Sequence, residues 1–209
     1  MNDTGESDEA LLAAYAAGDA AAFTRLYDRH ERPVFRYFLR QGQAVAQAED
    51  LLQETFLAVI RGAPRFTPSA RFTTWLYTIA RNKLIDQWRA SGRVESLDDA
   101  ANDPEDAQDE SALDRLPAAE STQPEVDASS REYARAFLGA VEALPAAQRD
   151  AFLMHAEGEL SLDEIAAVAS VGVETVKSRL RYAMRRLRVA CATWLPEEPD
   201  RATDGRSLS

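Results

Sequence analysis

The segment from Ser91 to Ser130 is the feature that most limits how this chain can fold. It holds twelve acidic and two basic residues, three prolines and no aromatic residue. Such a composition cannot bury enough apolar area to offset the entropy lost when a backbone is ordered. We therefore expect a mostly disordered linker between two globular parts.

The linker also changes how the charge of the whole chain is interpreted. The 209 residues carry a formal net charge of −11, which taken whole argues against a nucleic-acid-binding protein. The linker accounts for −10 of that charge, so the remaining residues sum to −1. Acidity is thus a property of one segment, and basic surfaces elsewhere stay possible.

Several function classes are disfavoured by what the sequence contains. Cys191 is the one cysteine, so an internal disulfide and a cysteine-based zinc site are not expected, and we predict no metal and no cofactor. There is no apolar run of membrane-spanning length and the N-terminus is acidic, so we expect a cytoplasmic protein. No convergent nucleophile or Gly-rich loop favours an enzyme.

Both parts read as helices, so the predicted fold class is all-α. Apolar residues recur at helical spacing, with Asp19 as a helix cap and Pro33 expected to kink or split its helix. We predict two small domains, an N-terminal helical bundle and a C-terminal helix-turn-helix domain. The expected order is a first domain, the linker, a second domain and a tail, at residues 7–90, 91–130, 131–195 and 196–209.

The end of the second part predicts a helix-turn-helix. Ser161 to Glu164 forms a capping box for a short helix, and a turn at Ser170 to Gly172 precedes a longer one. Between Gly172 and Ala190 there are six basic residues and one acid, Glu174. Such a helix reaches base edges with its first turns and phosphates further along. The candidate residues for duplex DNA are Thr175, Lys177, Ser178, Arg179, Arg181 and Arg185.

A second basic region mixes cations with aromatic residues. Between Arg61 and Arg93 there are seven basic residues and one acid, interleaved with five aromatic side chains. Aromatic faces beside cations suit unstacked single-stranded bases. The spacing of Phe72, Trp75, Ile79 and Trp88 favours a core role for them instead. The candidates for single-stranded DNA are Arg65, Phe66, Arg71, Tyr77, Arg81, Asn82 and Lys83, with Phe66, Tyr77 and Asn82 expected at the surface.

An acidic helical face precedes that region. Asp50, Gln53 and Glu54 share one side of a helix predicted from Ala44 to Arg61, opposite an apolar side. Three interpretations are open from the residues alone. The face is simply solvated, or it docks a basic partner, or it supplies carboxylates for acid–base catalysis, which the lack of companion groups disfavours.

Four motifs in this order resemble those of bacterial RNA polymerase sigma factors of the extracytoplasmic-function (ECF) group. The motifs are AEDLLQETFLAVI from Ala48, FTTWLYTIARNKLIDQWR from Phe72, LPAAQRDAF from Leu144, and LSLDEIAAVASVGVETVKSRLRYAMRRLR from Leu160. The resemblance covers nearly all of the chain except the linker and tails. It implies a subunit that binds core RNA polymerase and directs promoter recognition and melting, in a stress or envelope response.

The resemblance also implies a role for each candidate surface. Asp50, Gln53 and Glu54 would dock on a coiled coil of the largest polymerase subunit. The region from Arg61 to Arg89 would open the −10 element and hold an extruded base, and the last helix would read the −35 element. The linker would thread toward the channel for RNA, where its acidity suggests mimicry of the transcript. An inhibitory anti-sigma factor is a further implied partner.

One departure from the family pattern and one competing hypothesis accompany this interpretation. Gly172 and Glu174 depart from residues common in the family, so the promoter sequence cannot be inferred. The competing hypothesis is a free-standing helix-turn-helix regulator that binds duplex operators, as a dimer. A reader of duplex DNA does not need the basic and aromatic helix from Phe72 to Arg89, which favours the sigma factor.

Overall fold

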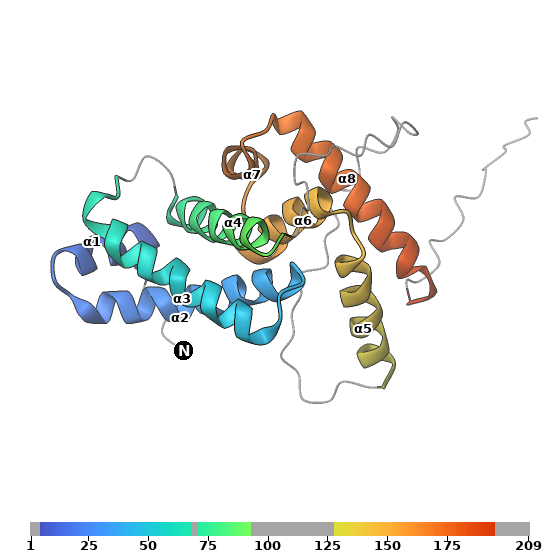
Figure 1. The fold of residues 1–209 in the computed structure, drawn as a ribbon, viewed down its shortest axis with the longest axis horizontal. Coiled ribbons are helices and arrows are strands. Elements are labelled where there is room, and N and C mark those ends of the chain that lie inside the picture. Colours follow the sequence, from blue (N-terminus) through green and yellow to red (C-terminus); the bar gives the residue numbers. More distant parts are fainter. Residues whose placement is uncertain (1–4, 68–70, 93–127, 195–209) are drawn as a thin grey trace, which may run out of the picture.

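The computed structural model describes residues 5–67, 71–92 and 128–194, and all regular structure in these ranges is helical (Figure 1). The expected linker and tail therefore lie almost entirely outside the described residues. The elements in order are α1 (Asp8–Ala16), α2 (Ala20–Arg40), α3 (Val45–Gly62), the short 3₁₀ helix η1 (Ala63–Arg65), α4 (Phe72–Ala90), α5 (Ala128–Glu142), α6 (Ala146–Gly158), α7 (Leu162–Ala169), α8 (Val173–Ala190) and the short 3₁₀ helix η3 (Ala192–Trp194).

Local sequence signals explain where the first helices begin. The Asp19 carboxylate accepts from the backbone N–H groups of Ala21 and Ala22 and caps α2, as predicted. α2 then continues through Pro33 to Arg40 as one helix, so of the two expected outcomes, a kink or a split, the split does not occur. Proline removes one backbone hydrogen bond from the helix. Burial of the residues that follow, Val34 among them, compensates for that loss.

Helices α1 to α4 form a bundle around an aromatic-rich core. Phe38, Phe72 and Leu84 are fully buried, and Phe56 of α3 contacts Tyr27 of α2 edge-on at 4.7 Å between ring centroids. α4 lacks a side-chain cap of its own. Its first N–H, from Phe72, instead donates to Oε1 of Glu9 in α1 at 2.7 Å, which ties the two helices together.

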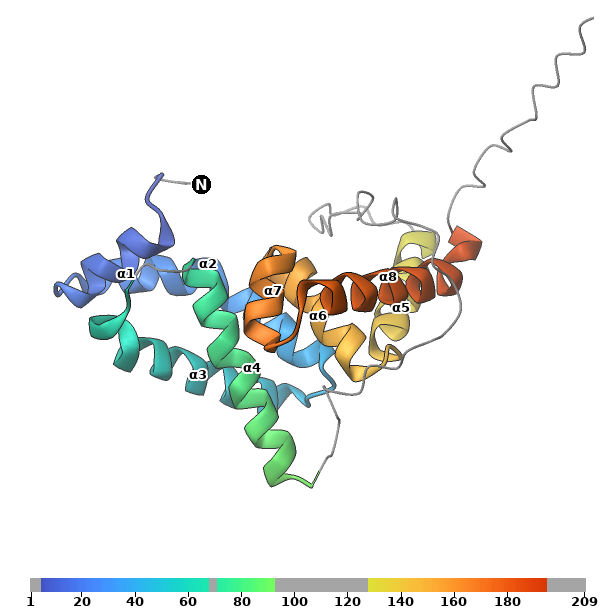
Figure 2. The same ribbon diagram turned by 90° about the horizontal axis from the view of Figure 1, so that it is seen from above.

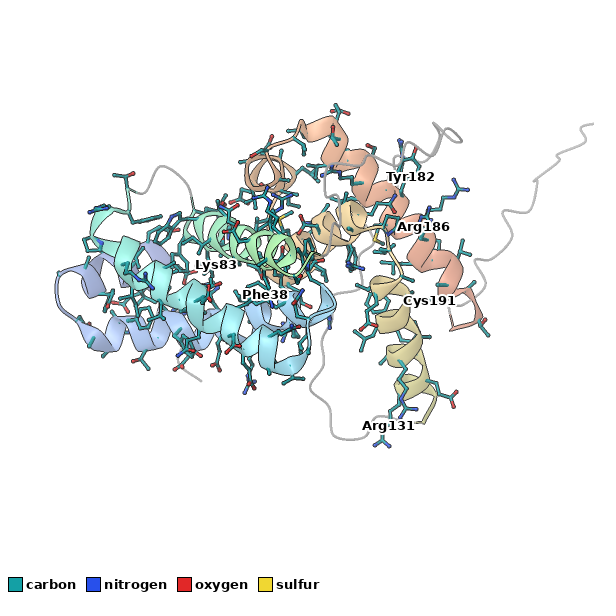
Figure 3. The ribbon with its side chains drawn as sticks, in the orientation of Figure 1. Phe38, Lys83, Arg131, Tyr182, Arg186 and Cys191 are labelled. Carbon is teal, nitrogen blue, oxygen red and sulfur yellow. The ribbon has the colours of Figure 1, made fainter. Side chains whose placement is uncertain are left out.

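Helices α5 to α8 form the second part, with α6 at its centre. α6 packs against α7 and α8, and α5 packs against α8. The predicted apolar side of α8 is confirmed, because Val176, Leu180, Ala183 and Leu187 are all buried. This leaves the basic side of α8 at the surface of the molecule, and Tyr182 and Arg186, which Figure 3 labels, lie on a neighbouring side of the same helix.

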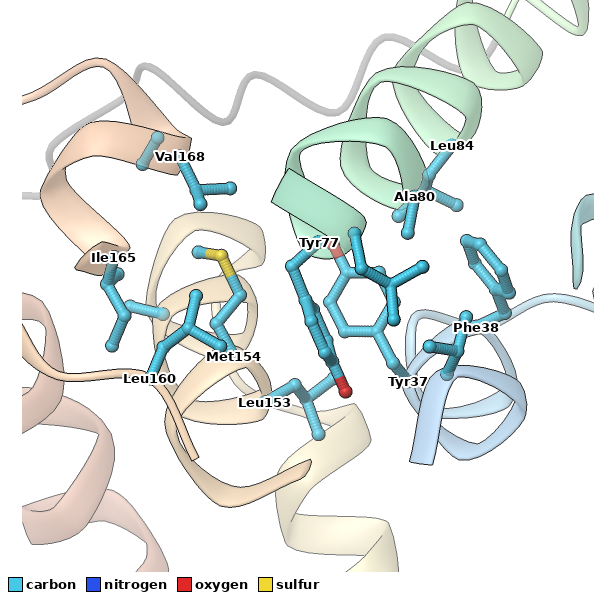
Figure 4. Packing of buried hydrophobic residues seen from close by; sticks show 14 of the residues in the cluster. Tyr37, Phe38, Tyr77, Ala80, Leu84, Leu153, Met154, Leu160, Ile165 and Val168 are labelled. Atoms are coloured by element: carbon cyan, nitrogen blue, oxygen red, sulfur yellow. The ribbon is translucent and has the colours of Figure 1, made fainter. Parts of the chain in front are cut away.

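The two parts pack directly on each other. α2 lies against α6, and α4 lies against both α6 and α7, as the view from above shows (Figure 2). Tyr77 of α4 sits between Tyr37 of α2 and Leu153 of α6, and buried residues from both parts form one cluster (Figure 4). The sequence predicted two globular parts, and the structure adds that they share a core.

Candidate nucleic-acid interface

The helix-turn-helix is built by backbone geometry that its sequence specifies. The Ser161 hydroxyl accepts a hydrogen bond from the Glu164 N–H at 3.3 Å. In turn, the Ser161 N–H donates to the Glu164 carboxylate at 2.9 Å. The predicted capping box is thus present. Ser170 ends α7 in the left-handed region at φ 56°, and Gly172 is the N-cap of α8. The turn fixes α8 with its first turns free to enter a groove.

The outward side of α8 presents most of the predicted duplex-contacting residues. Lys177 and Arg185 are exposed, and Thr175, Ser178 and Arg181 are partly exposed. The Lys177 ammonium pairs with the Glu174 carboxylate at 2.7 Å, so the acid at the start of this helix has a cation beside it. The α8 basic face, defined as these five candidate residues, is accessible as predicted.

Arg179 is placed differently from the other candidates on α8. It is 7% exposed and lies on the buried side of the helix, next to Val176 and Leu180. Its position follows from helical geometry, because three residues from Val176 is almost a full turn. The prediction that Arg179 contacts duplex DNA therefore does not fit this arrangement, because the side chain would have to move out of its buried position to reach DNA.

The structure describes only part of the loop before α4, and the described part contains the aromatic residue Phe66. Arg65 is exposed, whereas Phe66 is half-buried against Trp75 with ring centroids 5.0 Å apart. Gly62 lies so close to Trp75 that an added Cβ would be 2.7 Å from its ring. Phe66 and Trp75 thus share one half-exposed aromatic surface, while Phe72 and Trp88 are core residues as predicted.

Four residues at helical spacing, the N-cap residue of α4 and three residues within the helix, face the second part of the chain, and we call them the α4 stripe: Arg71, Thr74, Tyr77 and Arg81. The expectation that Tyr77 lies at the surface is wrong, since it is 1% exposed, with its ring against the Gly158 backbone. Arg81 is also buried, and Arg71 is exposed but paired with Glu164 at 3.3 Å. Burial follows because α6 and α7 cover this side of α4.

The remaining two α4 candidates lie off the stripe. Asn82 is exposed, as predicted, and Lys83 is partly exposed with its ammonium 3.0 Å from the Glu54 carboxylate (Figure 3). The seven residues proposed for single-stranded DNA are therefore not gathered on one open surface in this arrangement. Some of them are at the surface and others are occupied by contacts within the chain.

The contact between the parts centres on Asp150 of α6, which sequence reasoning missed. One of its carboxylate oxygens accepts from the Tyr37 hydroxyl at 2.7 Å and from Gln41 Nε2 at 3.0 Å. The other accepts from Arg81 Nε at 2.7 Å, with both side chains less than a tenth exposed. A buried carboxylate needs such partners, because desolvating an unpaired charge is costly.

Two further carboxylates of the second part reach the first. Glu157 pairs with Arg36 and Arg40 of α2, and its side chain is 4% exposed. Glu164 accepts from the Thr74 hydroxyl at 2.7 Å in addition to capping α7. The sequence alone gave no clear signal for these contacts, because polar residues are distributed around α6, and only the structure shows that Asp150 and Glu157 are buried.

Burial and these partners shift two pKa values. Burial and the Asp150 carboxylate raise the pKa of Tyr37 well above its usual value, so Tyr37 stays a hydroxyl donor. Burial opposes ionisation of Glu164, but hydrogen bonds from Ser161 and Thr74 and the Arg71 charge lower its pKa. Both groups are thus held in the protonation state that the contact between the parts requires.

The acidic face of α3 is open, as predicted. Asp50, Gln53 and Glu54 are all exposed on one side of the helix, and Leu51, Phe56 and Val59 are buried on the other. Within the ranges that the structure describes, no three acidic, histidine or cysteine side chains are placed to hold a metal ion. No helix of the described residues is long and apolar enough to cross a membrane.

Two family models match the chain, one for each part. The model described as Sigma-70 region 2 matches residues 26–94, and that described as Sigma-70, region 4 matches residues 134–187. The ECF RNA polymerase sigma factor RpoE of Cereibacter sphaeroides is 36% identical over 172 residues, which are 81% of this chain and 86% of RpoE. SigL of Mycobacterium tuberculosis is 33% identical over 186 residues, 86% of this chain and 94% of SigL.

Solved structures share the fold at lower identity. CnrH in complex with the cytosolic domain of CnrY superposes with a TM-score of 0.61 at 23% identity, covering 90% of this chain and 99% of CnrH. RpoE of Bartonella quintana in complex with the anti-sigma factor NepR gives 0.59 at 23%, covering 81% and 96%.

The fold and its faces thus define a two-part, all-helical transcription initiation factor. The chain belongs to the ECF RNA polymerase sigma factors, DNA-binding proteins that direct promoter recognition by RNA polymerase. The match to region 2 as well as region 4 favours this over a free-standing helix-turn-helix regulator.

Proposed function

We propose that the two parts divide the work of transcription initiation. Residues 7–90 dock on core polymerase and hold melted −10 DNA, and residues 131–195 read the −35 element, with residues 91–130 joining them. The observation that carries this division is the order of three charged faces along the chain. An exposed acidic face on α3 is followed by cations and aromatic residues around α4 and by the basic face of α8.

The α3 face is suited to docking on a basic partner. Asp50, Gln53 and Glu54 project from a helix whose other side is fixed in the bundle, so docking needs no rearrangement of that side. Acidic side chains in this position steer and orient a basic surface of core polymerase. They supply no chemistry, and polymerisation belongs to the core enzyme.

The DNA-facing roles follow from the chemistry of the side chains. Arg65 and the half-buried Phe66 offer a cation and an aromatic face to an unstacked base, with Asn82 and Lys83 further along α4. On α8, Arg181 lies at the middle of the helix, on the same side as Lys177 and Ser178 of its first turns, and we assign it to base edges; Arg185 lies one turn on, where phosphates are met.

An inhibitory partner belongs to the same proposal. Two similar structures are complexes, one of CnrH with the cytosolic domain of CnrY and one of the sigma factor RpoE with the anti-sigma factor NepR. We infer that this chain is also held by an anti-sigma factor, in the cytoplasm where polymerase and promoters are found. Pull-down from unstressed cells tests that partner.

Transcription in vitro tests the proposed function. Purified core polymerase with this chain should give discrete transcripts from genomic fragments that core polymerase alone does not give. A double variant, Asp50→Ala with Glu54→Ala, should reduce these transcripts and weaken core binding by about tenfold or more, because charged contacts at the interface are lost.

A matched double variant controls for the charge change. Asp28→Ala with Glu132→Ala removes two exposed carboxylates away from the α3 face and should leave core binding unchanged. Absence of any promoter-dependent transcript would exclude the sigma factor role, and operator binding without core polymerase would support the competing regulator.

A further inference from the structure

Glu174 is the only acidic residue between Gly172 and Ala190, and it lies where the α8 basic face begins. Its side chain is 85% exposed and belongs to the first turn of the helix. Helical period places it on the same side as Lys177 and Arg181. A carboxylate on the side of a helix that approaches DNA repels phosphates, so Glu174 weakens binding unless it makes a contact of its own.

We propose that Glu174 determines base specificity in the −35 duplex, by accepting a hydrogen bond from the N4 amino group of a cytosine in the major groove. The inference rests on the proposed function of α8 as the reader of that duplex, and it names one base pair that this chain selects. The position of Glu174 supports it, because the N-terminal residues of a recognition helix are those that contact base edges.

The chemistry of a carboxylate selects cytosine among the four bases. An ionised carboxylate accepts hydrogen bonds and donates none. In the major groove guanine presents two acceptors, thymine presents an acceptor and a methyl group, and adenine presents an amino donor beside the N7 acceptor. Cytosine alone presents an amino donor with no acceptor beside it on the same base. Glu174 is therefore matched by cytosine and opposed by the acceptors of the other bases.

Lys177 completes the recognition of the same base pair. Its ammonium lies 2.7 Å from Oε1 of Glu174, and both side chains reach solvent. In a C·G pair the cytosine amino group and guanine O6 are Watson–Crick partners, so a donor and an acceptor lie side by side in the groove. The carboxylate and the ammonium together offer the complementary acceptor and donor. The ion pair also balances the charge of Glu174 as the helix approaches phosphates.

The first turn of α8 holds Glu174 in an ordered position. The Ser178 hydroxyl donates to the backbone oxygen of Glu174 at 3.2 Å. The backbone N–H groups of Thr175 and Val176 donate to the Gly172 oxygen at 3.0 and 3.2 Å. Gly172, the N-cap, has no side chain that could cover the carboxylate. An acceptor carried on an ordered turn loses less entropy when it contacts a base than one carried on a flexible loop.

A purely structural role for Glu174 predicts a different result. A carboxylate in the first turn of a helix stabilises that helix through its dipole, whichever DNA sequence is bound. Loss of this stabilisation would weaken binding to all sequences alike and would leave the preferred bases unchanged. The identity of the preferred base is therefore the readout that separates the two roles.

Glu174→Gln tests the proposal in transcription by core polymerase with the full chain. The template is a promoter pool whose upstream element is randomised, and sequencing of barcoded transcripts gives the preference at each base pair. The wild type should favour cytosine at one position by about tenfold over the other bases. Glu174→Gln should move the preference at that position to adenine, because an amide donates to N7 and accepts from the N6 amino group.

Asp163→Asn is the matched control, because it removes an exposed first-turn carboxylate from α7, the other helix of the helix-turn-helix. The control should keep the base preferences of the wild type. Lys177→Met should reduce the preference at the position that Glu174→Gln changes. An effect of Lys177→Met confined to another position would overturn the assignment of both side chains to one base pair.

Three outcomes would overturn the role of Glu174 itself. The first is a wild-type profile without a cytosine preference at any position, which needs no variant to fold. The others are an unchanged profile in Glu174→Gln and a uniform loss of transcription without a change of preference. All three are seen in transcripts that depend on the promoter, so they differ from the absence of such transcripts, by which the proposed function fails.

Discussion

Single carboxylates determine how distant helices meet in this molecule. Glu9 of α1 accepts the first N–H of α4, Asp150 of α6 joins two helices of the first part, and Glu164 caps its own helix while it reaches α4. Each satisfies backbone or side-chain donors that would otherwise be buried without partners. For Glu9 and Glu164, whose pKa values are lowered in the folded chain, the contribution to stability therefore depends on ionisation.

Glu9 provides a pH-dependent test at this scale. Burial opposes its ionisation, but hydrogen bonds from the Phe72 N–H, from its own N–H and from the Ser7 side chain together lower the pKa of Glu9. Glu9→Ala should lower the free energy of unfolding by about 1 kcal/mol at neutral pH, since α4 has no other side-chain cap. Urea denaturation followed by circular dichroism measures this difference.

The sign of the pH effect follows from the direction of the shift. Because the folded pKa lies below the unfolded one, the ionised group stabilises the fold above its unfolded pKa, and this is lost as the pH falls through the folded pKa. The difference between wild type and Glu9→Ala should shrink accordingly in acid. A loss no greater than that of Glu49→Ala, an exposed acid on α3, would contradict the cap.

At the scale of elements, α8 combines two functions on opposite sides. Its buried side, from Val176 to Leu187, fixes the helix on α6 and α7, and its basic face remains accessible. Position along the helix then separates base reading from phosphate contact, because the first turns of such a helix lie deepest in the groove. Arg181 lies at the middle of α8, and Arg188 lies about two turns closer to its C-terminus, where phosphate contact is expected.

A pair of α8 variants tests that separation. Arg181→Ala should weaken binding to the preferred duplex by about 1–3 kcal/mol and relax its sequence preference, whereas Arg188→Ala should weaken all duplexes alike. Anisotropy with a duplex selected by the wild-type chain, and with scrambled duplexes, measures both. A uniform loss for Arg181→Ala would make it a phosphate contact instead.

At the scale of the whole molecule, the two parts share one buried cluster. Tyr37 and Tyr77 pack edge-on at 5.4 Å between centroids, beside the Asp150 network that joins α6 to α2 and α4. Such continuity couples the stability of the parts, because opening the contact exposes buried residues on both sides.

Cooperative unfolding is the corresponding prediction. Amide hydrogen exchange in α4 and α6 of the wild type should accelerate with urea in a single step. In Asp150→Asn the two helices should exchange in separate steps, while Asp163→Asn should behave as the wild type does. Separate steps already in the wild type would show that the parts are independent.

Much of the site could be predicted from the sequence because its signals are local. The Asp19 cap, the Ser161 capping box, the buried side of α8 and the exposed acidic face of α3 each depend on residues within a few turns of one helix. Helical period and capping chemistry are sufficient for such features, so these predictions are confirmed.

What only the tertiary structure decided is which sides of the helices are covered. Tyr77 and Arg81 were predicted to be accessible to DNA because nothing within α4 distinguishes a side facing solvent from a side facing another part of the chain. Arg81 meets Asp150 across 69 residues, and Tyr37 meets it across 113. Helical period reports which residues share a side, whereas the partner of a buried charge is set by packing between segments far apart in the chain.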